Sequence, residues 1–411
     1  MTSPDTSRGA RLDTVFVRWT WCRAVLHRGW WLVTSVYLVV EAHLPASDLV
    51  LIGVAQGAVA LLFEIPAGVL ADTVSRKWSL VVSQLLMGTA MVVTALVTGF
   101  WPLVATQMLW GLAWTFASGA DVAWISDELD DPARVPTVLV RSGRAQLTGA
   151  VAGLLGVGGL AWLTGPAPAM IVAGVAMLLL GAVVVVGFPE RRFVRAGTGR
   201  WAASWVILRR GSAVVRGSRV LLVVFAATLL ANGVAGAFGR LYPLRLVDLG
   251  LPADPVAWLT ALGALTFPLG AVALRAVQPH IDGGRTVRRG FVVACGVAVA
   301  GALGLAVAPE ELTGSVAVLL AAGALPLTRT FGTIWINRHT GSDVRATVHS
   351  LLAQAEYVGA IACGLGVAAV ARLGGPPLAF ATCAALLAAT IVLVRYGGPD
   401  GPPPPARRDN G

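Results

Sequence analysis

The sequence has a single lysine, Lys77, and few charged residues of any kind. Charged residues make up 13% of the 411-residue chain and hydrophobic residues 56%, whereas a soluble domain is typically about 25% charged and 45–50% apolar. A Walker-type phosphate loop needs a lysine followed by serine or threonine, but Lys77 is followed by Trp78. The sequence therefore excludes such a nucleotide-binding loop, and its composition favours a membrane protein.

Cysteine is also sparse, and its spacing indicates neither a disulfide framework nor a metal site. The four cysteines lie far apart in mostly apolar runs. The first thirteen residues lack the apolar core of a signal peptide, so we expect the first hydrophobic segment to be retained. The sequence contains no nucleophile elbow, zinc-ligand spacing or paired-carboxylate motif. We therefore predict that the protein is not an enzyme and holds no cofactor or metal.

Long apolar stretches separated by short polar or Gly/Pro breaks fill most of the chain. Each stretch is long enough for a transmembrane helix of about 20 residues. We expect a first set of helices at 22–42, 48–71, 77–99, 102–126, 135–163 and 167–188. A second set is expected at 218–246, 254–279, 288–308, 312–337, 344–373 and 376–396. The sequence predicts an all-α polytopic membrane protein of twelve transmembrane helices in two six-helix halves, 22–188 and 218–396.

Three shorter segments flank these halves. Residues 1–21 are expected to form an N-terminal segment and residues 189–217 a linker. In the linker, Trp201, Trp205 and Leu208 recur at helical spacing among arginines, which indicates an amphipathic helix lying in the membrane interface. Residues 397–411 are rich in glycine and proline, which predicts a disordered tail.

The distribution of arginine predicts the orientation. Arginines concentrate in the tails, the linker and the loops on the same side, whereas the opposite loops HLPAS, TGPAPA and PEE contain no arginine or lysine. By the positive-inside rule, both termini are expected in the cytoplasm, with the chain in a bacterial plasma (inner) membrane. The same distribution explains the pI of about 10.6 without a nucleic-acid partner.

An internal repeat supports the division into two halves. Residues 136–158 align without gaps to 346–368, and nine of the twenty-three positions are identical, including Gly149 with Gly359. Two shorter matches, AWIS with IWIN and Leu44-Pro45-Ala46 with Leu251-Pro252-Ala253, follow the same order at nearly the same offset. We therefore expect the halves to be pseudo-symmetric and repeated in parallel.

The most specific motif is GVLADTVSRK at 68–77, between the second and third expected helices. It resembles the signature loop G-x-L-A-D-x-x-G-R-K of the major facilitator superfamily, with Ser75 in place of a glycine. A tight turn needs small residues, a carboxylate can cap a facing helix N-terminus, and the basic pair can anchor the turn at the membrane surface. The resemblance implies a transporter, usually monomeric, whose conformational lock comprises Gly68, Asp72, Arg76 and Lys77 and stabilises the outward-facing state.

Other patterns of that family are incomplete. Gln107 stands where the fourth helix often carries an arginine linked to proton coupling, and Leu154 stands where exporters often carry a proline in the fifth helix. The segments FEIPAGVLADTVSRK and VRATVHSLL are similar to those of bacterial multidrug and tetracycline-efflux-like members. This similarity implies an exporter, while Gln107 argues against the usual coupling route.

Ionisable residues inside spans are functional candidates by default. Glu64 and Glu356 fall within the second and eleventh helices, which face each other in the family fold, so we expect them to share one region. A carboxylic acid in a low-dielectric site can take up and release a proton near neutral pH, which makes both glutamates proton-coupling candidates, followed by Asp121. The alternative is that these carboxylates are permanently protonated or salt-bridged and only structural.

Several other polar residues have more than one interpretation. Arg141 and Arg144 could form a cytoplasmic gate of salt bridges with Asp121, Asp127 and Glu128, or could bind an anionic substrate, and Arg329 raises the same question. His27 and Arg28 are expected to reach the lipid headgroups, and Trp30 and Trp31 to be packing or belt residues. The residues expected to line a central cavity are Gln56, Gln107, Gln146, Asn232 and Tyr357.

The function predicted from these features is secondary transport by alternating access. The leading hypothesis is efflux of a small amphipathic compound coupled to proton entry. The alternatives are uptake of a small anionic metabolite, favoured if Arg144 or Arg329 faces the cavity, and a non-transporting membrane sensor or scaffold. The expected partners are the lipid bilayer, a small-molecule substrate and protons.

Overall fold

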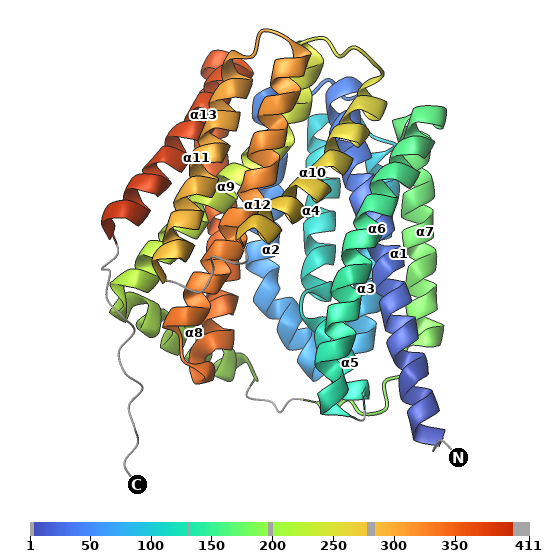
Figure 1. Cartoon of the computed structure of the whole chain (residues 1–411). Helices are drawn as coiled ribbons and strands as arrows, with labels where there is room; N and C mark the ends of the chain where they lie inside the picture. Colours follow the sequence, from blue (N-terminus) through green and yellow to red (C-terminus); the bar gives the residue numbers. More distant parts are fainter. Residues whose placement is uncertain (1–3, 130, 196–199, 278–283, 398–411) are drawn as a thin grey trace.

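The computed structural model describes residues 4–129, 131–195, 200–277 and 284–397, which form helices and no strand (Figure 1). The first half comprises α1 (Pro4–Val40), α2 (Ala46–Thr73), α3 (Arg76–Thr94), α4 (Phe100–Ala117), α5 (Ala120–Glu128), the 3-10 turn η1 (Pro132–Arg134), α6 (Val135–Thr164) and α7 (Pro166–Gly187). The second comprises α9 (Arg219–Asp248), α10 (Pro255–Val277), α11 (Gly284–Val307), α12 (Glu311–His339) and α13 (Ser342–Gly397), and α8 (Arg200–Gly217) connects the halves.

Within the described residues, twelve spans cross the bundle, in agreement with the predicted number. Eight helices of the described residues are long and apolar enough to span a bilayer. One of them, α13, contains two spans, because the backbone is non-helical at Gly374 and Gly375, and Gly375 has a positive φ of 66° that favours glycine. The remaining spans are α1, α4 with α5, and α10.

Two expectations change at the level of single elements, and a third falls mostly outside the described residues. Helix α1 begins at Pro4 rather than at residue 22, so most of the expected N-terminal segment belongs to the first helix. The fourth span is broken at Gly119, which has a φ of 76°, a left-handed conformation that is costly for other residues. Helix α8 occupies the expected linker, but the side chains of Trp201, Trp205 and Leu208 and the tail at 398–411 lie outside the described part.

The repeat found in the sequence recurs in the packing. Helix α6 packs along α1. The part of α13 before the break at Gly374, which we call its first arm, packs along α9. A Cβ added at Gly149 would lie 2.7 Å from the carbonyl oxygen of Trp21 in α1, and one at Gly359 would lie 2.1 Å from that of Leu229 in α9. The two aligned glycines therefore allow the same close approach of backbones, as is common between membrane helices.

We expect Gly153→Ala to destabilise the protein by about 1–3 kcal/mol, the usual cost of overpacking. A Cβ at Gly153 would lie 2.1 Å from the Val25 carbonyl oxygen, a backbone atom that cannot rotate away. Gly156→Ala in the same helix is the matched control, because a Cβ there meets nothing within 4 Å. Thermal unfolding of the purified variants measures the difference, and equal losses for the two variants would contradict this packing.

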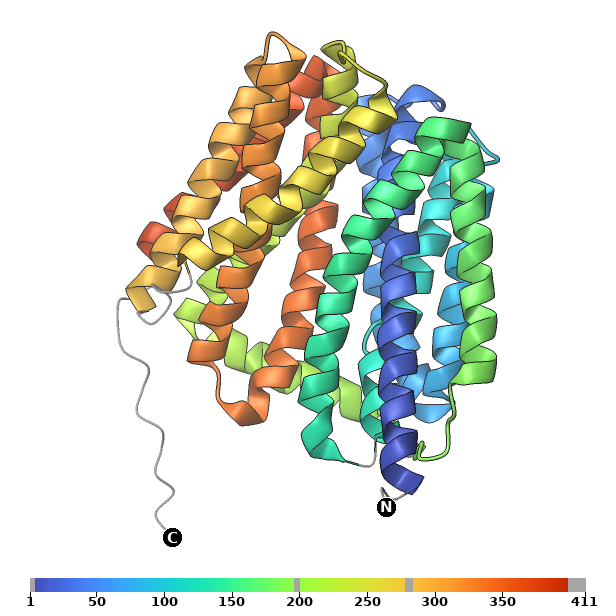
Figure 2. The same ribbon diagram turned by 45° about the vertical axis from the view of Figure 1, so that its right-hand side comes forward.

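The two halves touch mainly at the end of the bundle opposite the termini. There α2 packs against the first arm of α13, and a Cβ at Gly57 would lie 3.8 Å from the Ala360 Cβ. Asp48 and Arg372 approach to 4.0 Å across the halves at the same end. Toward the termini, Leu62 and Phe63 of α2 are 69% and 43% exposed, and the helices of the two halves diverge (Figures 1 and 2). The described halves therefore meet at one end of the bundle and separate toward the termini.

Candidate functional site

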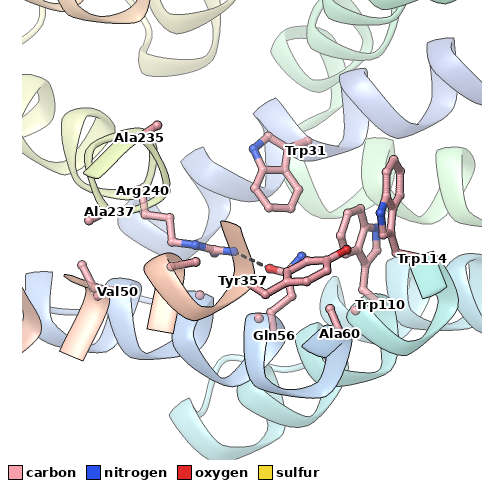
Figure 3. Close-up of a pocket in the computed structure, with 17 residues that line it drawn as sticks. Trp31, Val50, Gln56, Ala60, Trp110, Trp114, Ala235, Ala237, Arg240 and Tyr357 are labelled. Carbon is pink, nitrogen blue, oxygen red and sulfur yellow. Dashed lines mark hydrogen bonds between the residues drawn. The ribbon is translucent and has the colours of Figure 1, made fainter. Parts of the chain in front are cut away.

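A cavity of about 330 Å³ lies between the two halves, enclosed by residues of α1, α2, α4, α9 and the first arm of α13. Its wall contains small residues, mostly glycine and alanine, and six larger polar or aromatic side chains (Figure 3). These six are Trp31, Gln56, Trp110, Trp114, Arg240 and Tyr357. Because both halves contribute to the wall, relative movement of the halves would change the cavity.

Arg240 of α9 is the cation of this cavity. Its guanidinium donates a hydrogen bond to Gln56 Oε1 and lies 5.1 Å from the centre of the Trp31 ring (Figure 3), within the range of a cation–π contact. A Cβ at Gly53 would lie 2.3 Å from Arg240 Nε, so this glycine leaves the space through which the side chain passes. No carboxylate is among the residues that line the cavity in the described part.

Aromatic rings form the opposite part of the wall. The rings of Trp110 and Trp114 stack at 5.9 Å, and Trp31 lies 5.3 Å from Trp110. Trp31 therefore lines the cavity, whereas the sequence suggested a packing or belt residue. His27 stacks on Trp110 at 5.1 Å and does not extend toward the headgroups, because the early start of α1 places it deep in the helix.

The two glutamates predicted for proton coupling both lie near Tyr357. Glu64 Oε1 accepts a hydrogen bond of 2.7 Å from Ser118, at the break between α4 and α5. Glu356 forms a 3.0 Å ion pair with Arg329 of α12. The phenol of Tyr357 lies within electrostatic reach of both glutamates. The structure thus brings Glu64 and Glu356 into one region beside the cavity and joins Glu356 to Arg329, which the sequence treated separately.

The expected gate between Arg141 or Arg144 and nearby carboxylates is not formed. Asp121 lies 3.5 Å from Arg23 of α1. The other two carboxylates also have different partners, since Asp127 pairs with Arg76 and Glu128 accepts bonds from the backbone N–H groups of residues 191 and 192. Arg141 and Arg144 do not line the central cavity either, because they lie on the face of α6 that borders a separate groove against α1.

The polar residues expected in the cavity divide into three groups. Gln56 and Tyr357 line it. Gln146 borders a smaller hollow of about 150 Å³ with Arg23, His27 and Arg28. Gln107 and Asn232 line neither space. Gln107 is buried and donates to Thr94 of α3 over 3.4 Å, and Asn232 donates to the Thr228 carbonyl of its own helix over 3.1 Å.

The loop between α2 and α3 connects three parts of the first half. Arg76 contacts Asp72 at 3.2 Å, Asp127 of α5, and the Ala123 carbonyl at 3.1 Å. Lys77 donates its backbone N–H to Glu190 Oε1 over 3.0 Å, while a Cβ at Gly68 would meet nothing within 4 Å. The loop therefore ties the end of α2 to α5 and to the segment that follows α7.

Ser75, which replaces a glycine of the family pattern, has a structural role of its own. Its hydroxyl accepts a hydrogen bond from the Trp78 N–H (2.9 Å), capping α3, and donates to Glu190 Oε2 (2.5 Å). We expect Ser75→Ala to reduce stability by about 1–2 kcal/mol, since it removes the cap and a bond to a charged acceptor. Ser79→Ala is the control, because the buried Ser79 hydroxyl has no hydrogen-bond partner among the described residues.

Thermal unfolding of both serine variants checks this prediction. Ser79→Ala should leave the midpoint within the scatter of the wild type. A Ser75→Ala midpoint equal to that of Ser79→Ala would contradict the role given to Ser75.

Arg240 is the candidate site residue that sequence reasoning missed. The signal was present, because an arginine lies deep within the expected span 218–246, and charged residues at such depth usually mark function. Its contact with Gln56 could not be predicted, since the two residues are 184 positions apart and meet only when the halves assemble.

No group of three or more histidine, cysteine, aspartate or glutamate side chains that could hold a metal ion occurs in the described part. The four cysteines are free. The residues that line the cavity offer a positive charge, hydrogen bonds and aromatic surface, next to two carboxylic acids.

Comparisons with known proteins agree with this architecture. A family profile described as Major Facilitator Superfamily matches residues 22–364, and no curated protein sequence matches the chain. Among solved structures, the nucleoside transporter NupG is 13% identical with a TM-score of 0.74, over 93% of this chain and 97% of that one. A POT family transporter in complex with a thioalcohol-conjugated peptide is 12% identical with a TM-score of 0.70, over 93% and 94% of the two chains. An inward-facing, unoccupied bacterial homolog of the lysosomal transporter Spinster is 14% identical with a TM-score of 0.66, over 97% and 96%. At these identities the likeness shows the fold alone.

Proposed function

Because the chain belongs to the major facilitator superfamily, we propose that it is a secondary transporter that exports a small amphipathic compound in exchange for protons. The observation that carries this proposal is the cavity between the halves, whose aromatic wall lies beside Glu64 and Glu356. Aromatic surface suits the apolar part of a substrate. A carboxylic acid next to such a site can exchange a proton as the substrate binds and leaves.

The conformational change in this proposal is alternating access, in which the cavity opens to one side of the membrane at a time. In this proposal the two halves rock about the cavity, and the termini face the cytoplasm of a bacterial inner membrane, so the described structure is open to the cytoplasm. The Asp72–Arg76 loop would then stabilise the outward-facing state of the cycle. The protein works as a monomer within the lipid bilayer, with protons as the coupling ion and no nucleic-acid partner.

Arg240 favours a substrate that carries a negative charge. A guanidinium desolvated between membrane helices is costly without an anion nearby, and no carboxylate lines this cavity in the described residues. The stacked tryptophans and Arg240 together suit a compound that has an aromatic body and an acidic group. The same residue favours the second candidate function, uptake of a small anionic metabolite, because an arginine lines the cavity, although it is Arg240 and not Arg144 or Arg329.

The direction of transport is tested by accumulation in cells. Cells that express the protein are compared with cells that carry the empty vector, for a panel of aromatic acids and lipophilic cations. Lower accumulation of an acid in the wild-type cells supports export, and higher accumulation supports uptake. Equal accumulation for every compound would favour the third hypothesis, a membrane sensor or scaffold, over both transport proposals.

A further inference from the structure

A second hollow, which the transport proposal does not use, lies between α1 and α6 near the termini end. Its volume is about 580 Å³, and it is the groove that Arg141 and Arg144 border. Arg18 of α1 faces them across the groove. These three side chains are exposed, and no carboxylate lines the groove in the described part of the chain.

The groove lies on the outer surface of the first half and does not belong to the central cavity. On α6, Arg144 and Thr148 border the groove, whereas Gln146 and Ala150 border the hollow on the cavity side. The two sets therefore lie on opposite faces of the helix. In Figure 2 the lower parts of α1 and α6 run side by side at the front of the molecule, and no other helix crosses in front of them.

The side chains of Arg141 and Arg144 start just inside the hydrocarbon core, within reach of the lipid phosphates. A 30-residue helix such as α6 is about 45 Å long, so a hydrocarbon core of about 30 Å leaves about 7 Å at each end. Arg141 and Arg144 follow the start of α6 at Val135 by roughly 9 and 14 Å at 1.5 Å per residue. Their long side chains can extend from there to the headgroup level.

The other residues that line the groove are suited to contact the acyl chains of a lipid. Val17, Trp21 and Ala145 give the groove an apolar floor, and Trp21 is 40% exposed. Tryptophan is enriched at the boundary between headgroups and acyl chains. A guanidinium binds phosphate through two parallel hydrogen bonds, and basic pockets between membrane helices bind anionic headgroups.

We propose that the groove formed by Arg18, Arg141 and Arg144 binds the phosphate headgroup of an anionic phospholipid, whose acyl chains lie on the apolar floor between α1 and α6. A free anion would not use this floor, and a substrate moving through the central cavity would not meet it. The site therefore stands independently of the proposed transport function.

Native mass spectrometry of the delipidated full-length protein tests this proposal. The probes are phosphatidylglycerol and phosphatidylcholine with identical acyl chains, titrated separately. We expect wild-type protein to bind phosphatidylglycerol at least tenfold more tightly than phosphatidylcholine. The variant Arg18→Gln/Arg141→Gln/Arg144→Gln should lose that preference, and the corresponding triple lysine variant should keep most of it.

The matched control is Arg191→Gln/Arg195→Gln/Arg209→Gln, which removes three exposed arginines outside the groove. It should bind phosphatidylglycerol like the wild type. Equal affinity of the wild type for the two lipids would overturn the proposal, and so would an unchanged preference in the groove variant. The first of these results needs no variant, so a folding defect would not leave the question open.

Discussion

Arg240→Gln is expected to weaken the binding of an aromatic carboxylate by at least about 30-fold. Removing one partner of a buried, hydrogen-bonded charge pair usually costs 2–5 kcal/mol, and the lower bound of that range corresponds to about 30-fold. Affinity for the matching carboxamide should change little, since the amide has no charge to lose. The measurement is calorimetric titration of purified protein with naphthoate and naphthamide, as representatives of compounds that match the cavity.

The stability of the same variant separates a binding role from a structural one. A buried guanidinium without a carboxylate partner destabilises a folded protein, so Arg240→Gln should melt at the same temperature as the wild type or higher. Arg240→Lys keeps the charge but loses the planar contact with Trp31 and should bind with intermediate affinity. An Arg240→Gln variant that binds the carboxylate as tightly as the wild type would contradict the role of Arg240.

Glu64→Gln and Glu356→Gln are expected to separate proton movement from substrate movement. Glutamine keeps the shape of the side chain but cannot carry a proton, so substrate-dependent proton flux should fall at least tenfold in a variant that lacks the coupling group. Exchange of labelled for unlabelled substrate needs no net proton transfer and should persist. Proteoliposomes that enclose a pH-sensitive dye measure the first quantity, and isotope exchange in the same vesicles measures the second.

The environments of the two glutamates make Glu64 the stronger candidate for the group that carries the proton. Glu356 is tied to the Arg329 guanidinium by a 3.0 Å ion pair, whereas Glu64 accepts a hydrogen bond from the neutral Ser118 and has no cation among its hydrogen-bond partners in the described residues. Arg329→Gln would release Glu356 and serves as the matched perturbation. If both glutamine variants keep the wild-type proton flux, neither glutamate is the proton carrier, and Asp121, paired with Arg23, is the next residue to test.

The fold could be predicted from the sequence because its signals are local. Apolar length sets the number of spans, and the repeat that aligns Gly149 with Gly359 sets the arrangement of halves. Both glycines lie in equivalent close contacts, Gly149 against α1 and Gly359 against α9. The break at Gly119 was missed, because a single glycine in an apolar run does not reveal a left-handed backbone.

The site was less predictable because its contacts are long-range. The resemblance to the family placed Glu64 and Glu356 in one region, but it did not place Tyr357 near both of them. It could not tell which face of α6 carries Arg141 and Arg144, since the orientation of a mostly apolar helix depends on its neighbours. Arg240 was overlooked for a different reason. Its charge inside a span was visible in the sequence, but its position at the cavity depends on Gly53, which leaves space for the side chain, and on Gln56, which accepts its hydrogen bond.

A reversible cross-link between the halves tests alternating access most directly. A Cβ at Gly57 would lie 3.8 Å from the Ala360 Cβ, which is the usual separation in a disulfide, so Gly57→Cys/Ala360→Cys should oxidise readily in a background without native cysteines. We expect the oxidised protein in proteoliposomes to show no transport of compounds that the wild type moves, and reduction to restore it, while each single cysteine variant remains active. Transport at the wild-type rate with the disulfide formed would contradict a mechanism in which the two halves separate at this contact.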